Sequence, residues 1–190
     1  VYAPTAGTLR ILSPYIVGKG ALVMIFPLTQ RTKMFAAEII KGRPVSYASL
    51  RGSKAYPCLH GKVSFYGVRG GTLVVAEVFG LPTGTGNCGQ KVFGFHIHEG
   101  RSCTGNAEDS FSNAGSHLNP SNCPHPSHAG DMPPLFGNNG YAWSAFFTQR
   151  LTAAEAIGRT VIIHGSPDDF HTQPSGDAGM KIACGEIKWA

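Results

Sequence analysis

Short alternating runs of apolar and polar residues dominate the chain from about residue 45 onwards, and they predict β-strands rather than helices. The 25 glycines and 13 prolines separate many of these runs and favour turns and loops. One helical turn is expected over 152–155, where Thr152 and Glu155 have capping-box spacing. The candidate strands cover 45–50, 62–66, 72–79, 92–98, 141–147, 159–164 and 181–189.

Two connections between these strands differ greatly in length. The segment 67–71 is glycine-rich and resembles a hairpin turn. The segment 99–140 is far longer than ordinary connections in compact domains. Such a loop needs something to organise it, and bound metal together with a disulfide would do so. We therefore expect an all-β domain with long functional loops.

The segment 92–98 places two imidazoles side by side. Side chains at positions i and i+2 of a strand share a face, so His96 and His98 point the same way. A nitrogen pair of this kind suits a first-row transition metal, copper or zinc above all. The opposite face carries the apolar residues Phe93, Phe95 and Ile97.

Further candidate ligands follow downstream in three blocks. With His96 and His98, these blocks contain six of the eight histidines. His125, His128 and Asp131 offer two nitrogens and a carboxylate, a set that Zn²⁺ accepts, and His117 is the nearest candidate for a fourth ligand. His164 ends an apolar run and is expected to close a buried strand. The other two histidines, His60 and His171, are interpreted as ordinary hydrogen-bonded groups.

Composition and charge narrow the function classes. The 190 residues, with 42% hydrophobic and 14% charged, suffice for one globular domain plus an appendage. The formal net charge is +5, but Lys and Arg are scattered without a basic run, which argues against nucleic-acid binding. The positive net charge is better matched by a small anionic substrate. A positive rim around the metal cleft would raise the rate at which such an anion reaches the cleft.

Residues 1–43 form an N-terminal extension of different character. Their apolar stretches, 11–17 and 21–28, are too short for a membrane-spanning helix. No convincing signal peptide is present, so a cytoplasmic location is slightly favoured over an extracytoplasmic one. Met34 precedes the entry into the domain, which suggests that residues 1–33 lie upstream of the natural start. The intact mass of the native protein tests this hypothesis.

The motifs of residues 44–190 together resemble the copper/zinc superoxide dismutase family. They are GFHIHE, GSHLNP, HAGD, IGRTVIIH followed by two aspartates, and ACGEI. The resemblance implies a Greek-key β-barrel or sandwich of about eight antiparallel strands with long metal-binding and electrostatic loops. It also implies that a homodimer can form.

The resemblance assigns a role to each candidate residue. Asp168 would hydrogen-bond one ligand of each metal, and Cys103 and Cys184 would form an internal disulfide. His117 would bridge the two metals as an imidazolate. Copper would be held by His96, His98, His117 and His164, and zinc by His117, His125, His128 and Asp131.

The activity implied by the resemblance is the dismutation of superoxide. One superoxide would reduce the copper and leave as dioxygen, and a second would reoxidise it and leave as hydrogen peroxide, with His117 carrying one of the protons. Lys181 stands where the family usually has an arginine that guides the anion. The positive charge is kept and the planar fork of donors is lost, so we expect a slower enzyme, which Lys181→Arg would accelerate at low ionic strength.

Other readings of the same residues stay open. A non-catalytic copper- and zinc-binding module for copper delivery or storage would keep the ligands and lose substrate guidance, in line with Lys181. A mononuclear zinc hydrolase at His125, His128 and Asp131 lacks an evident general base. The odd number of cysteines leaves at least one unpaired; Cys58, Cys88 and Cys123 have no assigned partner, although Cys88 and Cys123 flank metal-bearing segments.

Overall fold

The computed structural model describes residues 36–86, 89 and 91–190, of which Ile39–Ala190 form one compact unit. The expected start at Met34 and the residue Cys88 lie outside these described residues. Within them, residues 36–41 are helical, and no helix has the length and hydrophobicity needed to span a bilayer. The remaining elements are β1 (Ser46–Gly52), β2 (His60–Val68), β3 (Gly71–Phe79), β4 (Val92–Phe93), β5 (Phe95–His98), the 3-10 helix η1 (Ser112–Ala114), β6 (Leu135–Phe136), β7 (Tyr141–Thr148), β8 (Thr160–His164) and β9 (Lys181–Trp189).

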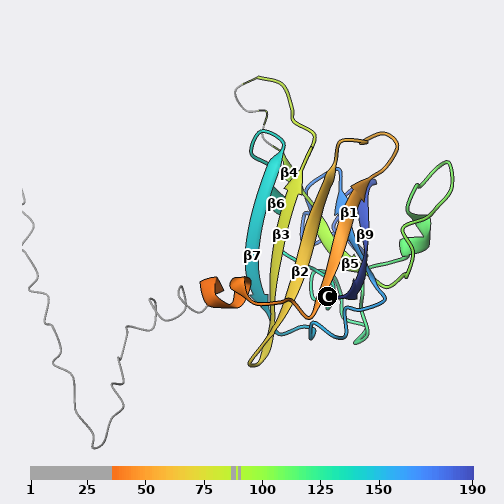
Figure 1. The fold of residues 1–190 in the computed structure, drawn as a ribbon. Helices are drawn as coiled ribbons and strands as arrows, with labels where there is room; N and C mark the ends of the chain where they lie inside the picture. Colours follow the sequence, from red (N-terminus) through yellow and green to blue (C-terminus); the bar gives the residue numbers. More distant parts are fainter. Residues whose placement is uncertain (1–35, 87–88, 90) are drawn as a thin grey trace, which may run out of the picture. The chain divides into compact units, whose positions relative to one another are not determined.

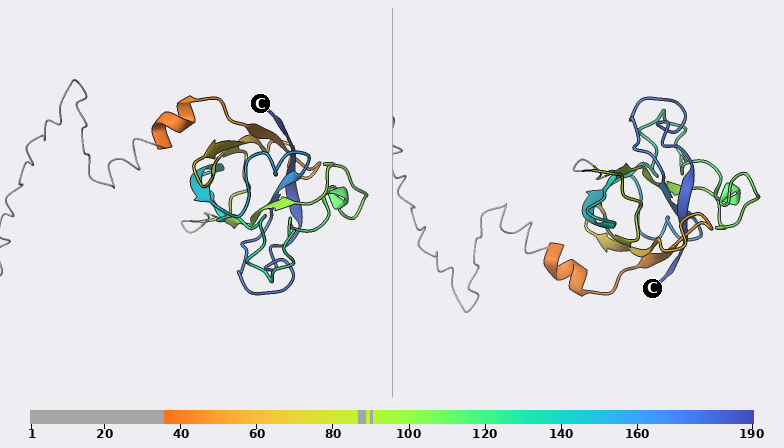
Figure 2. Two further views of the ribbon diagram at one scale, coloured as in Figure 1. Left: turned by 90° about the horizontal axis from the view of Figure 1, so that it is seen from below. Right: turned by 90° about the horizontal axis from the view of Figure 1, so that it is seen from above.

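Seven of these strands form one antiparallel sheet in the order β5-β8-β9-β1-β2-β3-β7 (Figure 1). β1 lies between its sequence neighbour β2 and the last strand β9, so distant parts of the chain meet in a Greek-key pattern. Seen along the strands, the sheet curls around its own inner face as a half-barrel (Figure 2). This architecture confirms the all-β Greek-key prediction.

Large apolar side chains fill the inside of the curled sheet. Phe65 of β2, Phe95 and Ile97 of β5 and Ile163 of β8 are fully buried in one continuous core. Residues at alternate positions of these strands point inward, and burial of each such side chain contributes about 1.5–3 kcal/mol. The core therefore fixes β5 and β8, the two strands that carry three of the candidate ligands.

The hairpin between β2 and β3 forms within the segment 67–71, as the sequence predicts. Val68 pairs with Gly71, which leaves Arg69 and Gly70 as a two-residue hairpin loop in which Gly70 has a φ of +85°. At 152–155 both capping-box bonds form, from the Thr152 N–H to the Glu155 carboxylate and from the Glu155 N–H to the Thr152 hydroxyl. The chain makes a hydrogen-bonded turn there, in which the Glu155 N–H also lies 3.1 Å from the Thr152 carbonyl oxygen, and Gly158 after it has a φ of +75°.

The expectation of one continuous strand over 92–98 is wrong. The strand breaks at Gly94, so that β4 pairs with β6 and β5 pairs with β8. The Gly94 N–H donates to the carbonyl of Ser166, and its own carbonyl accepts from the His164 N–H. Gly94 is thus hydrogen-bonded to the end of β8 and to Ser166 just beyond it, and it has no partner in β6.

Candidate metal centre

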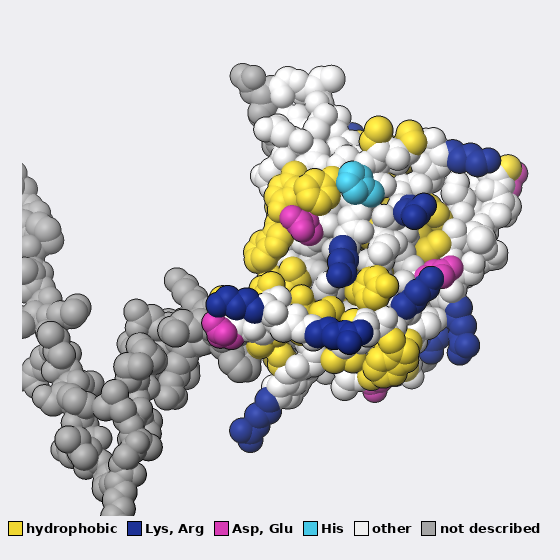
Figure 3. All heavy atoms as spheres, in the orientation of Figure 1, with side chains coloured by type: hydrophobic (Ala, Val, Ile, Leu, Met, Phe, Trp, Pro, Cys, Tyr) yellow, Lys and Arg dark blue, Asp and Glu magenta, His cyan; other side chains and the backbone are white. Residues whose placement is uncertain are grey.

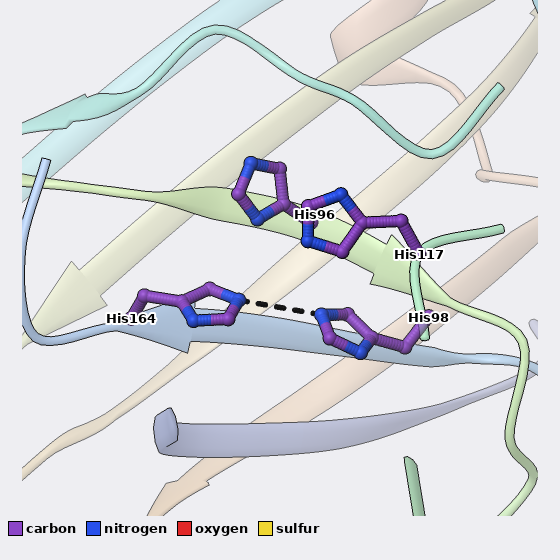
Figure 4. Close-up of side chains that lie close together, drawn as sticks. All are labelled: His96, His98, His117 and His164. Atoms are coloured by element: carbon purple, nitrogen blue, oxygen red, sulfur yellow. Dashed lines mark hydrogen bonds between the residues drawn. The ribbon is translucent and has the colours of Figure 1, made fainter. Parts of the chain in front are cut away.

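Four histidines from three parts of the chain meet at one end of β5. His96 and His98 belong to β5, and His164 is the last residue of β8, the strand paired with β5. His117 comes from the long loop and forms an isolated bridge with His98. Figure 4 shows the four rings converging from these elements (Figure 4). Their ligand nitrogens all lie within 4.8 Å of one another, and all four residues are buried.

Backbone carbonyls decide where the protons of His98 and His164 lie. The Nδ1 atom of His98 is 2.8 Å from the Gly115 carbonyl oxygen, and that of His164 is 3.0 Å from the Gly179 carbonyl oxygen. Because a carbonyl only accepts, each Nδ1 carries the proton and each neutral ring keeps a lone pair on Nε2. These two Nε2 atoms face each other at 3.3 Å, the dashed contact in Figure 4.

Protonation does not relieve this opposition of lone pairs at neutral pH. Burial, together with the charge of neighbouring histidines, lowers the pKa of His98 well below its usual range. Burial likewise lowers the pKa of His164 to about 4. Two lone pairs held face to face in a buried site are the arrangement that a cation between them would stabilise.

His96 and His117 supply two further nitrogens to the same space. The Nε2–H of His96 donates to Asp168 at 2.7 Å, which leaves its Nδ1 as a lone pair, and this Nδ1 is buried without a hydrogen-bond partner. The Nε2 of His117 is buried and unpartnered as well. Orphaned buried nitrogens are uncommon in folded proteins. These two, together with the facing Nε2 atoms of His98 and His164, fit a metal that prefers imidazole ligands.

The second ligand group gathers around the carboxylate of Asp131. Its members, His117, His125, His128 and Asp131, again have ligand atoms within 4.8 Å of one another. The Nδ1 atoms of the three histidines lie at 2.8, 3.1 and 3.3 Å from the Asp131 oxygens. Three nitrogens and one carboxylate oxygen are a complete tetrahedral zinc set.

The zinc-type group also contains a conflict that a cation would resolve. The Nε2–H of His125 donates to Asp168 at 2.9 Å, so the Nδ1 of a neutral ring is a lone pair directed at the negative Asp131 oxygen. The chain around His125 is nonetheless fixed in place. Gln173 accepts from the His125 N–H at 2.9 Å and donates to its carbonyl at 2.7 Å.

Backbone bonds dock the long loop onto β5. The Leu118 N–H donates to the Ile97 carbonyl at 2.8 Å, and the Ile97 N–H donates to the Gly130 carbonyl at 2.9 Å. At Gly130 an added Cβ would lie 2.2 Å from the Ile97 carbonyl oxygen, so the close approach requires glycine. His117 and Asp131, the neighbours of Leu118 and Gly130 in the chain, are thereby placed over the strand.

The loop that precedes His117 is tied to the sheet covalently. Cys103 and Cys184 of β9 form the disulfide that the resemblance implied. Phe111 of the same loop is buried against these cysteines and Ile162 of β8. The loop therefore runs beside β9, as Figure 1 shows for the segment that carries η1. Cys58 and Cys123 are free thiols.

A cleft of about 730 Å³ opens over the histidines. His98, His117 and His164 line it, and so does Lys181. Lys181 is the one Lys or Arg among the described residues that line this cleft. The other charged side chains among its described lining residues are acidic, namely Glu99, Glu108 and Asp109. On the face of β1, β2 and β3, Lys and Arg also lie dispersed (Figure 3), as their scatter along the sequence predicted.

The structure thus places all the candidate ligands in two groups that share His117, and it brings Asp168 and Lys181 next to them. His60 and His171 lie outside both groups in the described part of the chain. Sequence reasoning missed Asp109, which is ion-paired with Lys181, and Gln173. No spacing signal could have found Asp109, because 72 positions separate it from Lys181.

The half-barrel thus carries two adjoining groups of side chains, with His117 in common, each of which could hold a metal ion. A family model described as copper/zinc superoxide dismutase matches residues 59–187. The chain therefore belongs to the copper/zinc superoxide dismutase family. This confirms the predicted family, with its oxidoreductase class and its pair of metals, copper and zinc.

Similar proteins support the same family. A copper/zinc superoxide dismutase of Aquifex aeolicus is 30% identical over 143 residues, which cover 67% of this chain and 79% of that protein. One from Legionella pneumophila is 32% identical over 139 residues, covering 70% and 80%. The solved copper/zinc superoxide dismutase of Brucella abortus superposes with a TM-score of 0.63 at 26% identity, covering 75% of this chain and 99% of that one.

Proposed function

We propose that this chain dismutates superoxide to dioxygen and hydrogen peroxide at a copper centre that shares His117 with a structural zinc. Copper would be held by Nδ1 of His96 and by Nε2 of His98, His117 and His164. Zinc would be held by Nδ1 of His117, His125 and His128 and by the carboxylate of Asp131. Bound copper supplies one-electron redox chemistry, and zinc supplies none.

The two-sided position of His117 carries this proposal. Its Nδ1 is 2.8 Å from Asp131 in the zinc-type group, while its buried Nε2 has no partner and belongs to the four-histidine group. One ring therefore offers a nitrogen to each group. Asp168 couples the groups a second time, because its two oxygens accept from His96 and His125.

The chain's own residues account for access and proton supply. The cleft admits a diatomic anion to the exposed side of His98, His117 and His164, where the Lys181 ammonium also lies. Peroxide needs two protons for each product molecule. We assign one to Nε2 of His117, which can take up a proton whenever it is not ligating, and the other to solvent through the open cleft.

The shared histidine can be tested without any turnover measurement. In protein loaded with copper at both sites, two Cu²⁺ ions joined through one imidazolate couple magnetically. The integrated electron paramagnetic resonance intensity at low temperature should then fall well below that of two isolated ions per chain. Protein loaded with one copper and one zinc is the control, with the intensity of one ion. Full intensity for two isolated ions would contradict the bridge.

A non-catalytic copper- and zinc-binding module is the second candidate. The acidic lining of the cleft and the pairing of Lys181 with Asp109 favour it, because both weaken the attraction of an anion. Such a module would bind both metals with the same ligands. Full loading with both metals and no superoxide-dependent turnover would identify it.

A further inference from the structure

Lys181 lies beside the four-histidine group with its charge already partnered. It is the first residue of β9 and pairs in register with His164 of β8. Its ammonium donates a hydrogen bond to Oδ2 of Asp109 in a close ion pair. Both residues line the cleft, with side chains that are 17% and 35% exposed. The ion pair therefore lies inside the cleft that leads to the four-histidine group.

The Asp109 carboxylate is held firmly in this position. Its other oxygen, Oδ1, accepts from the Phe111 N–H at 2.9 Å, and its main-chain carbonyl accepts from the Asn106 N–H at 3.0 Å. Phe111 is itself buried against the disulfide between Cys103 and Cys184. The disulfide-tied loop thus aims Oδ2 at Lys181, so the pair does not depend on two freely rotating side chains.

The charges around the pair determine its effect on an anion. Partial burial acts to raise the pKa of Asp109, but the hydrogen bond from Lys181 and the bond from the Phe111 N–H lower it, and the net shift is downward. The carboxylate is therefore ionised at neutral pH. It offsets the single ammonium, and Glu99 and Glu108 add further negative charge to the described lining of the cleft.

We propose that Asp109 is a specificity-determining residue of this cleft, which fixes the Lys181 ammonium beside His164 and offsets its charge, so that small anions are attracted only weakly. The inference rests on the proposed function in one respect, that the substrate is the superoxide anion. Coulomb energies between groups a few ångströms apart at a partly buried site are large enough to change encounter rates severalfold.

The first test is Asp109→Asn in the copper- and zinc-loaded protein. Asparagine keeps an oxygen for the Phe111 N–H and removes the negative charge, so the loop is retained. We expect kcat/KM for superoxide to rise about threefold at low ionic strength, and the gain to shrink as salt screens the charges. An unchanged or lower kcat/KM would overturn the proposal.

Azide binding gives a readout that does not require turnover. Azide is a small anion, and its binding can be followed by the visible absorption of the copper-loaded protein. We expect the dissociation constant for azide to fall about threefold in Asp109→Asn and to rise about threefold in Lys181→Gln. If neither the native chain nor the variant dismutates superoxide, the proposed function fails, while the azide constants still test Asp109.

Glu108→Gln is the matched control. It removes one negative charge from the adjacent residue, which lines the same cleft and has no ion pair within the described part of the chain. We expect it to change the azide dissociation constant by clearly less than Asp109→Asn does. Equal changes in the two variants would show a general effect of net charge and would overturn the specific role of the Asp109–Lys181 pair.

Discussion

At the scale of single residues, the Asp168 carboxylate orients one histidine in each of the two ligand groups. Its oxygens accept from the Nε2–H groups of His96 and His125, one from each ligand group. Each bond leaves the opposite ring nitrogen, Nδ1, free to ligate. Backbone carbonyls do the same for His98 and His164 with the nitrogens exchanged. The proton positions on four of the six histidines thus depend on acceptors outside the ligand groups.

Asp168→Asn should weaken metal binding. The asparagine amide offers one acceptor and one donor, so one of the two histidines loses its acceptor and the proton position that frees Nδ1. We expect copper or zinc affinity to fall about 10- to 100-fold in competition with a chelator. Asp169→Asn is the control, because that carboxylate binds Thr172 and the His171 N–H, outside both ligand groups. Equal affinities for Asp168→Asn and the native chain would refute this role.

Lys181→Arg should raise the dismutation rate at low ionic strength. A guanidinium can keep Asp109 with one edge and present its remaining N–H donors to the anion, whereas the ammonium is largely committed to Asp109. The measurement is kcat/KM at several salt concentrations, and the difference should disappear at high salt. A rate that stays the same at low salt would remove Lys181 from the mechanism.

At the scale of elements, the meeting of β4, β5 and β8 depends on Gly94. An added Cβ there would lie 2.8 Å from the Ala178 Cβ, 3.3 Å from the His164 Cβ and 3.4 Å from Cε1 of His96. The approach of β5 to β8 thus leaves no room for a side chain between two members of the four-histidine group. This is a constraint on position rather than on φ, because Gly94 is not in the positive-φ region.

Gly94→Ala should therefore disturb the four-histidine group selectively. We expect a changed visible absorption spectrum of bound copper and a lower copper affinity, with zinc affinity retained, because the added methyl group contacts His164 and His96. Gly67→Ala on β2 is the matched control, since its Cβ would meet only Val45 at an ordinary 3.4 Å. Identical spectra for Gly94→Ala and the native chain would count against the role assigned to Gly94.

Sequence reasoning succeeded at this scale where a feature is local. The hairpin within 67–71, and the placement of His96 and His98 on one strand, follow from turn chemistry and strand periodicity. The break at Gly94 did not follow from the alternation of its neighbours. It depends on hydrogen bonds to Ser166 and His164, some seventy positions away, which no local pattern contains.

The candidate site shows the same limit. The ligand residues could be named because their motifs are dense in histidine and specific to a family. The proton positions on His98 and His164 could not be predicted from the sequence, because they depend on the backbone carbonyls of Gly115 and Gly179. The Asp109–Lys181 pair was equally hidden, and so were the acidic residues Glu99 and Glu108 that line the same cleft.

At the scale of the whole molecule, the buried histidines link stability to pH. Burial, then the charge of His117, lowers the pKa of His96 to about 2, and burial lowers that of His164 to about 4, from an ordinary 6.5. In the unfolded chain both groups take up protons below pH 6.5, whereas in the folded metal-free protein they remain neutral. Acidification therefore favours unfolding.

Above pH 6.5 we expect these two histidines to make no pH-dependent contribution to the free energy of unfolding of the metal-free protein. It should fall between pH 6.5 and about 4, with each histidine contributing up to about 1.4 kcal/mol per pH unit. Below pH 4 the His164 contribution ends and that of His96 continues. Urea unfolding across this range measures the slope, and a stability that is flat or rises on acidification would contradict the account.

In the proposed function, two adjoining ligand groups hold copper and zinc, and superoxide is dismutated at the copper. The most direct test is superoxide dismutation by protein reconstituted with both metals, with copper and zinc counted in the same sample. We expect turnover at about one copper and one zinc per chain, because the two ligand groups have different donor sets. Full loading with both metals and no turnover would contradict it and would leave a metal-binding module on a dismutase scaffold.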